Sequence, residues 1–226
     1  TQSAVFATYY NEFSIGYSIA NMSSAPCDCN NVQTAYCLES CLYNIGSTNW
    51  IVSVTSNIEL LTNQTTWSGI LPMPISDGVT LQGVSSGVVS KWWESNCPLI
   101  TTDHTATYIA QNQKLMFLFA IEGNATIEGL RIRGSNLGFK DFNQPTILSG
   151  GFYTYDLLGM TTSATFRNIE ISGFSYTAIF KSVLYDDVQI ENCYIHKVKG
   201  IHYSGIGYGA WFQADRSGDQ IIDINN

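Results

Sequence analysis

A short apolar unit recurs along the second half of the chain and constrains the fold more than any other feature. Its complete copies are 124–134 (NATIEGLRIRG), 163–173 (SATFRNIEISG) and 187–196 (DVQIENCYIH), and 78–83 (GVTLQG) and 219–226 (DQIIDINN) repeat parts of it. Each complete copy has a strand-like segment, a Gly or Asn, and a second strand-like segment. Gly and Asn tolerate the left-handed backbone that a sharp corner requires. The unit therefore predicts two short strands joined at a corner.

The copies align in columns of alternating apolar and polar residues. Side chains two positions apart lie on the same face of a strand, so the alternation separates an inner from an outer face. The alignment predicts corners at Gly83, Gly129, Asn168 and Asn192. The predicted inner columns are Leu81, Ile127, Phe166 and Ile190; Leu130, Ile169 and Cys193; and Ile132, Ile171 and Ile195. The predicted outer columns are Arg131, Glu170 and Tyr194, and Arg133, Ser172 and His196.

The spacing of the copies predicts a solenoid with one copy per coil. Phe166 and Ile190 are 24 residues apart, whereas Ile127 and Phe166 are 39 apart and Leu81 and Ile127 are 46 apart. The longer intervals fit coils with inserted loops. A β-sandwich is the alternative, but it does not predict stacked corners. We therefore expect an all-β fold in which residues 48–226 form a right-handed parallel β-helix.

Residues 1–47 lack the repeat, and we expect them to form an N-terminal cap or assembly segment. Thr34–Tyr43 has apolar residues at helical spacing and Gly46 as a stop signal, which predicts one short helix. A clustered, even set of cysteines in this segment favours disulfides over zinc, because the spacing is not a standard zinc pattern and no His is near. These cysteines are Cys27, Cys29, Cys37 and Cys41.

Composition predicts an exported protein that is extracellular or bound to the cell surface. The net charge is −8 with only ten Lys and Arg, which excludes the basic footprint of a nucleic-acid binder. No apolar run approaches the roughly 20 residues that span a bilayer, so no membrane insertion is expected. The start at Thr1 without a leader fits a mature chain, and an introduced boundary is the alternative. Sequons predict N-glycosylation at Asn21, Asn63 and Asn124.

Two segments add a family resemblance to this pattern. The stretch 74–83 (PISDGVTLQG) resembles the first coil of pectin-lyase-like right-handed β-helix proteins. The stretch 194–212 is similar to coils of secreted β-helix-repeat proteins, which often carry Gly-Tyr-Gly before a strand. The resemblance covers about residues 70–226. It implies the fold and not the activity, because this fold hosts lyases, hydrolases, adhesins and structural proteins.

The acidic residues form no recognisable catalytic pattern. Enzymes of the resembled family use carboxylate-bound Ca²⁺ with an Arg or Lys base, or paired aspartates, and their signature motifs are absent here. Asp186 and Asp187 are weak catalytic candidates, because neighbouring strand residues point to opposite faces. Asp215 is a third weak candidate, and a Ca²⁺ site there with Asp219, Asp223 and Glu191 has no calcium-loop spacing. We therefore expect no metal and no other cofactor, and favour a protein without enzymatic activity.

Aromatic residues are the other candidates for a binding site. Trp92 and Trp93 lie beside Cys97, and further rings stand near one coil, at Tyr203, Tyr208, Trp211 and Phe212. Exposed rings in a row can stack on sugars, but they also bury loops or form interfaces. The sequence favours packing in the core or an interface over a sugar site.

The last copy ends inside a repeat, so either further residues or another subunit would complete the stack. The second option predicts a homopolymer built by strand addition, with Cys97 as a candidate for an intermolecular disulfide. The expected function is thus an extracellular structural protein that self-assembles through β-helix ends or edges into a sheath, surface layer or filament. The alternative is a polysaccharide lyase, a hydrolase or a glycan-binding module.

Overall fold

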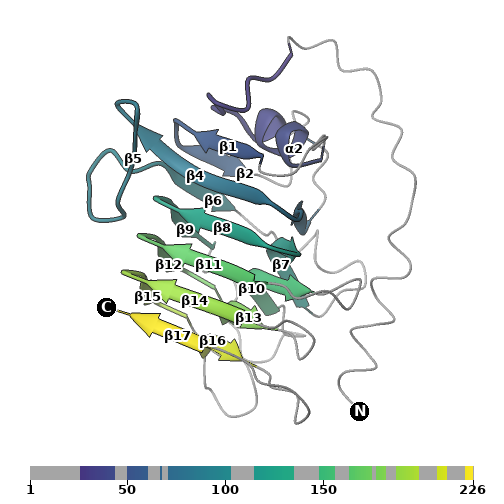
Figure 1. The fold of residues 1–226 in the computed structure, drawn as a ribbon, viewed down its shortest axis with the longest axis vertical. Coiled ribbons are helices and arrows are strands. Elements are labelled where there is room, and N and C mark those ends of the chain that lie inside the picture. Colours follow the sequence, from purple (N-terminus) through teal and green to yellow (C-terminus); the bar gives the residue numbers. More distant parts are fainter. Residues whose placement is uncertain are drawn as a thin grey trace, which may run out of the picture.

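The chain folds as a stack of short strands, with one helix among the residues that the structure describes (Figure 1). The computed structural model describes residues 26–43, 50–60, 67, 71–102, 115–134, 148–155, 163–174, 177–181, 187–198, 208–212 and 222–225. Every strand pair in these ranges is parallel except the β4–β5 hairpin. The expected all-β class with a single short helix is therefore confirmed for the described part of the chain.

Three sheets run along the stack. The first sheet contains β1 (Ile51–Val54), β4 (Val79–Ser85), β8 (Ala125–Glu128), β11 (Ser163–Arg167), β14 (Asp187–Glu191) and β17 (Ile222–Asn225), with β5 (Val88–Val89) beside β4. The second sheet contains β2 (Ile58–Leu60), β6 (Leu99–Thr102), β9 (Arg131–Arg133), β12 (Glu170–Ser172) and β15 (Tyr194–His196). The third sheet contains β3 (Met73–Ile75), β7 (Leu115–Glu122), β10 (Leu148–Tyr155), β13 (Thr177–Lys181) and β16 (Tyr208–Phe212).

The chain visits the three sheets in the same order on every pass. It runs through β1, β2 and β3, then β4, β6 and β7, then β8, β9 and β10, and so on to β17. We call each pass through the three sheets a rung. Each strand pairs with the strand at the same place in the neighbouring rungs. The repeat seen in the sequence is therefore the first-sheet strand, the corner and the second-sheet strand of one rung.

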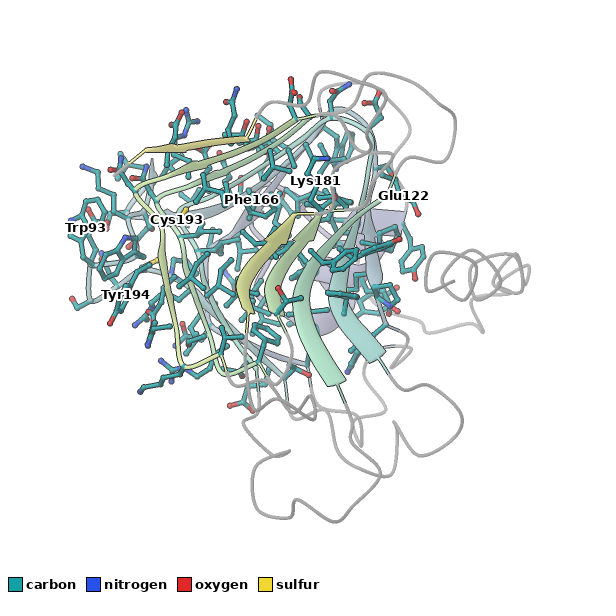
Figure 2. All side chains as sticks on the ribbon, turned by 90° about the horizontal axis from the view of Figure 1, so that it is seen from below. Trp93, Glu122, Phe166, Lys181, Cys193 and Tyr194 are labelled. Carbon is teal, nitrogen blue, oxygen red and sulfur yellow. A yellow bond between two sulfur atoms is a disulfide. The ribbon has the colours of Figure 1, made fainter. Side chains whose placement is uncertain are left out.

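The pairing register confirms the predicted inner column of the first sheet. Leu81 pairs with Ile127, Ile127 with Phe166, and Phe166 with Ile190. All of these side chains are buried, and Phe166 packs edge-on against Phe152 of the third sheet with 5.1 Å between ring centroids. Figure 2, which looks along the stack, shows Phe166 among the side chains that fill the space between the sheets.

The predicted corners are confirmed at three positions and wrong at one. Gly129, Asn168 and Asn192 have φ of 64°, 54° and 50°. Gly83 instead lies within β4, because the chain continues into the β4–β5 hairpin and turns at Ser86 and beyond. A Cβ at Gly83 would meet the Gly129 carbonyl, so the close approach of two rungs requires glycine there.

One outward position is less exposed than the alternation predicts. Ser172 pairs with Arg133 on one side and His196 on the other. Its own side chain is only 3% exposed. The outer column itself is as predicted, but a short side chain between two long ones is shielded from solvent.

Helix α2 (Ala35–Tyr43) covers the first rung. It contacts β1, β2 and β3, and its Leu38 and Leu42 side chains are buried. The Thr34 hydroxyl accepts a hydrogen bond from the Cys37 amide at 3.2 Å, which caps the helix start. The structure has the predicted disulfides, paired Cys27–Cys37 and Cys29–Cys41. The domain boundary expected after residue 47, like the stop signal at Gly46, falls outside the described residues.

Candidate functional site

Most of the predicted acidic site residues fall outside the described ranges. Asp186 and Asp215 lie there, as do the sequon residues Asn21 and Asn63. Asp187 begins β14 and is half-buried, in register with Ser163. Within the described ranges, no three His, Cys, Asp or Glu side chains lie close enough together to hold a metal ion. The acidic residues therefore supply no catalytic or metal site that can be built from described geometry.

Asn124, the third predicted glycosylation site, links three rungs. Its side-chain amide donates to Asp77 Oδ1 at 2.9 Å, and its backbone amide donates to the same oxygen at 2.8 Å. Its Oδ1 accepts from the backbone amide of Ser163 at 3.0 Å. The residue is exposed, and its glycosylation stays a prediction. Its described hydrogen bonds tie the rungs together.

Cys97 is placed differently from the prediction of an intermolecular disulfide. Its side chain is only 1% exposed, and its thiol donates to the Gly129 carbonyl at 3.2 Å. Burial raises the pKa of the Cys97 thiol from 9.0 to about 11. The segment between β4 and β6 folds this cysteine back under a corner of the stack. The thiol is therefore shielded from neighbouring molecules in this structure, and the intermolecular disulfide stays a prediction.

Cys193 faces the core side of its corner, as predicted. It is half-buried and packs against the core, and its thiol lies 3.3 Å from both the Phe166 and Glu191 carbonyl oxygens. Burial also raises the pKa of this thiol to about 11. A protonated thiol is a poor nucleophile, so Cys193 acts as a small packing residue.

An insert that starts at the end of β4 and continues to β6, residues 84–98, carries the most distinctive surface feature. It begins with the β4–β5 hairpin, and its Trp92 indole donates to the Asn192 carbonyl at 2.9 Å. Asn192 belongs to the corner between β14 and β15, so the insert extends from the second rung to the fifth. Figure 2 shows Trp93 of the insert and Tyr194 of β15 at the same corner of the stack, near Cys193.

Four side chains form a ring cluster there, which we define as Trp92, Trp93, Tyr194 and His196. Trp92 stacks on Tyr194 with centroids 5.0 Å apart, and His196 stacks on Tyr194 at 4.2 Å. Tyr194 therefore stacks against two rings, and it remains 45% exposed. Trp93 stands edge-on to Trp92 at 5.4 Å and is 53% exposed. Trp93 is therefore the ring that offers most of its surface to a ligand.

Polar contacts fix the cluster in place. His196 Nε2 lies 2.7 Å from Glu170 Oε1, which orients the imidazole and the ring stacked on it. The Arg131 guanidinium donates twice to the Cys97 carbonyl, at 2.7 and 3.1 Å, and so ties the insert to the second sheet. These contacts hold the rings rigid before any ligand arrives, which lowers the entropic cost of binding.

A positive group, the side chain of Lys91, lies against the exposed ring. Its ammonium lies 5.5 Å from the Trp93 ring centroid. The neighbouring carboxylate of Glu94 bonds to the backbone and not to this ammonium, since it accepts a hydrogen bond from the backbone amide of Lys91 at 3.1 Å. In the described part of the chain, Lys91 forms no ion pair.

Sequence reasoning found the parts of this cluster but not their assembly. Tyr194 and His196 were predicted to face outward, beside Glu170, by the alternation alone. Trp92 packs as predicted, whereas Trp93 is exposed and is not part of the core, so the predicted interface is the option left for it. No local signal links Trp92 to Asn192, which is 100 residues away. The insert's path over the corners is a tertiary feature without a periodic pattern.

Two charged residues of the third sheet were also missed. Lys181 is fully buried at the end of β13, in register with Thr154. Burial raises the pKa of the Glu122 carboxyl at the end of β7. Figure 2 shows both on the side of the stack away from Trp93. They lie far from the ring cluster and add nothing to its chemistry.

The comparisons with known proteins add no family. No protein-family model matches the chain, and no curated protein and no solved structure matches it significantly. The likeness to pectin-lyase-like proteins therefore depends on the repeat and on the stacked parallel sheets alone.

Proposed function

We propose that the described sheets belong to a right-handed parallel β-helix of the pectin-lyase-like kind. Support comes from the constant order of the three sheets and from their in-register parallel pairing. Connections between parallel strands of one sheet are almost always right-handed, because twisted strands pack back in only that way. The fold would then be a rigid rod that presents loops on its sides.

We propose further that the protein works outside the cell. Its two disulfides are typical of oxidising compartments. None of the described helical structure is long and apolar enough to cross a membrane.

The function that we infer is glycan binding through the ring cluster. One observation carries it: Trp93 exposes 53% of its surface while the rings behind it are held by stacking and hydrogen bonds. The apolar face of a sugar ring packs on such an indole, and neighbouring polar groups receive its hydroxyls. Tyr194 and the Glu170–His196 pair are polar groups of the cluster that could receive them.

A glycan array tests this function with three proteins: the full chain, Trp93→Ala and Val88→Ala. Val88 is a matched control, because it is an exposed apolar residue, 64% exposed, of the same insert. We expect the full chain and the control to bind the same glycans, and Trp93→Ala to bind them at least about tenfold more weakly. Equal binding by all three proteins, or no bound glycan at all, would contradict the proposal.

Self-assembly into a sheath, surface layer or filament is a second candidate function. The observation that favours it is that β15, β16 and β17 are edge strands of the described sheets, whereas α2 covers the first rung. Exposed strand edges recruit further strands. Light scattering over a range of protein concentrations, with and without reductant, tests this proposal. Growth of the mass with concentration would support it, and a monomer throughout would reject it.

A further inference from the structure

We infer that Lys91 makes the ring cluster selective for glycans that carry an anionic group, a carboxylate or a sulfate. This inference depends on the proposed glycan binding, and it names the ligand class and the residue that selects it. It starts from the one exposed cation that lies against the exposed indole in the described structure.

The position of Lys91 is fixed by its own turn. The Glu94 amide donates to the Lys91 carbonyl at 2.9 Å, and the Glu94 carboxylate accepts from the Lys91 amide at 3.1 Å. The backbone amide and the carboxylate of Glu94 are thus both bonded to the backbone of Lys91. The lysine ammonium is left over the Trp93 ring without a carboxylate partner among the described residues. A ligand anion would be the first negative charge to pair with it.

The surroundings of the cluster add positive charge to an acidic protein. The whole chain has a net charge of −8, with ten Lys and Arg. Arg131 and Arg133 lie on the outer face of the second sheet, in register with the columns that hold Tyr194 and His196. Two carboxylates lie in these columns: Glu170, which is bonded to His196, and Glu59, which lies in the first rung, two register steps from Arg133. Lys91 beside the exposed indole and the two arginines of this face are positive groups that favour an anionic ligand in an otherwise acidic protein.

The geometry assigns separate tasks to the two side chains of the insert. The indole of Trp93 packs against the apolar face of a sugar ring, while the ammonium of Lys91 meets an acidic substituent at the ring edge. An ammonium is a compact point charge, so it accepts carboxylate and sulfate alike, without the fixed fork of a guanidinium. A neutral sugar gains the stacking but not the charge pairing.

Binding of matched oligosaccharides to the full chain tests the inference. Three ligands share one backbone and differ only in being neutral, carboxylated or sulfated, and titration calorimetry compares the full chain with Lys91→Met and Lys91→Arg. A pair of unit charges near 4 Å in a watery setting is worth about fivefold in affinity. We expect this preference for the anionic ligands in the full chain and in Lys91→Arg, weakened by salt. We expect Lys91→Met to lose the preference and to keep its affinity for the neutral ligand.

Several outcomes would overturn the inference. A preference for anions that survives in Lys91→Met would show that another group selects the charge. An equal loss of neutral and anionic ligands in Lys91→Met would reduce the lysine to a packing role. Either result leaves glycan binding intact, provided that Trp93→Ala still weakens it. If the full chain binds none of the ligands, or if Trp93→Ala binds all of them normally, the proposed function itself fails.

Discussion

Substitution of Gly129 with alanine should lower the free energy of unfolding by about 2–5 kcal/mol, from two separable causes. Gly129 has φ of 64°, and the left-handed region costs an L-residue about 1–2 kcal/mol. A Cβ there would lie 2.6 Å from the Ser90 carbonyl oxygen and 3.0 Å from that of Gly83. Both are backbone atoms and cannot rotate away, so overpacking adds about 1–3 kcal/mol.

Asn168 supplies the matched comparison for Gly129. It occupies the same corner one rung further along, with φ of 54°, but it already carries a Cβ. Asn168→Ala therefore adds no atom and should cost about 1 kcal/mol, the difference in tolerance of the left-handed region. Urea unfolding followed by circular dichroism, with equal m-values, measures both changes.

The difference between the two substitutions isolates the clash at the insert. If Gly129→Ala were no more destabilising than Asn168→Ala, the insert would not lie against this corner. If Gly129→Ala were stabilising, the corner would not be left-handed at all, because alanine helps only where the native backbone suits it.

Two further predictions concern the cysteines. Since burial raises the pKa of Cys97 and Cys193 from 9.0 to about 11, the folded protein at pH 8 should resist alkylation, and both thiols should react after unfolding. Because these pKa values are higher in the folded protein than in the unfolded chain, the stabilisation that they contribute is complete below pH 9 and is lost as the pH rises toward 11. The urea midpoint should therefore fall between pH 9 and 11. A midpoint that stays constant over this range would argue against buried thiols. Reduction of the disulfides Cys27–Cys37 and Cys29–Cys41, whose cysteines are 10 and 12 residues apart, should destabilise the helical cap by about 2–4 kcal/mol. The unfolding temperature should therefore be lower with reductant than without it. An unchanged unfolding temperature would mean that the cap contributes little to the stability of the stack.

The inner and outer columns could be predicted from sequence because the strand period is local and survives irregular loops. Phe166 and Ile190 align in the sequence at the spacing at which the structure pairs them. Left-handed corners were equally visible, since few residues other than Gly and Asn accept them. The helix was predicted correctly for the same reason, because Ala35–Tyr43 has its own apolar period.

The third sheet and the insert could not be predicted in the same way. Strand β7 is a nearly continuous apolar run, which indicates burial but carries no register, and β10 (LSGGFYTY) does not alternate apolar and polar residues. Gly83 matched the corner column by residue type, yet its glycine is required by contact with a neighbouring rung. Likewise the exposure of Trp93 depends on where the insert lies. The hydrogen bond from Trp92 to Asn192, which joins residues 100 positions apart in the sequence, fixes that place.

Paired cysteines on the outer face of the stack test whether its parallel rungs are in register. Thr126 and Thr165 are register partners in β8 and β11, and neighbouring strands lie about 4.8 Å apart, within the Cα distance that a disulfide spans. Thr126 and Arg167 are offset by two residues, which puts their Cα atoms beyond about 7 Å. Mild oxidation should therefore cross-link Thr126→Cys/Thr165→Cys and leave Thr126→Cys/Arg167→Cys open. Cross-linking of the second pair alone, or of neither, would contradict the stack.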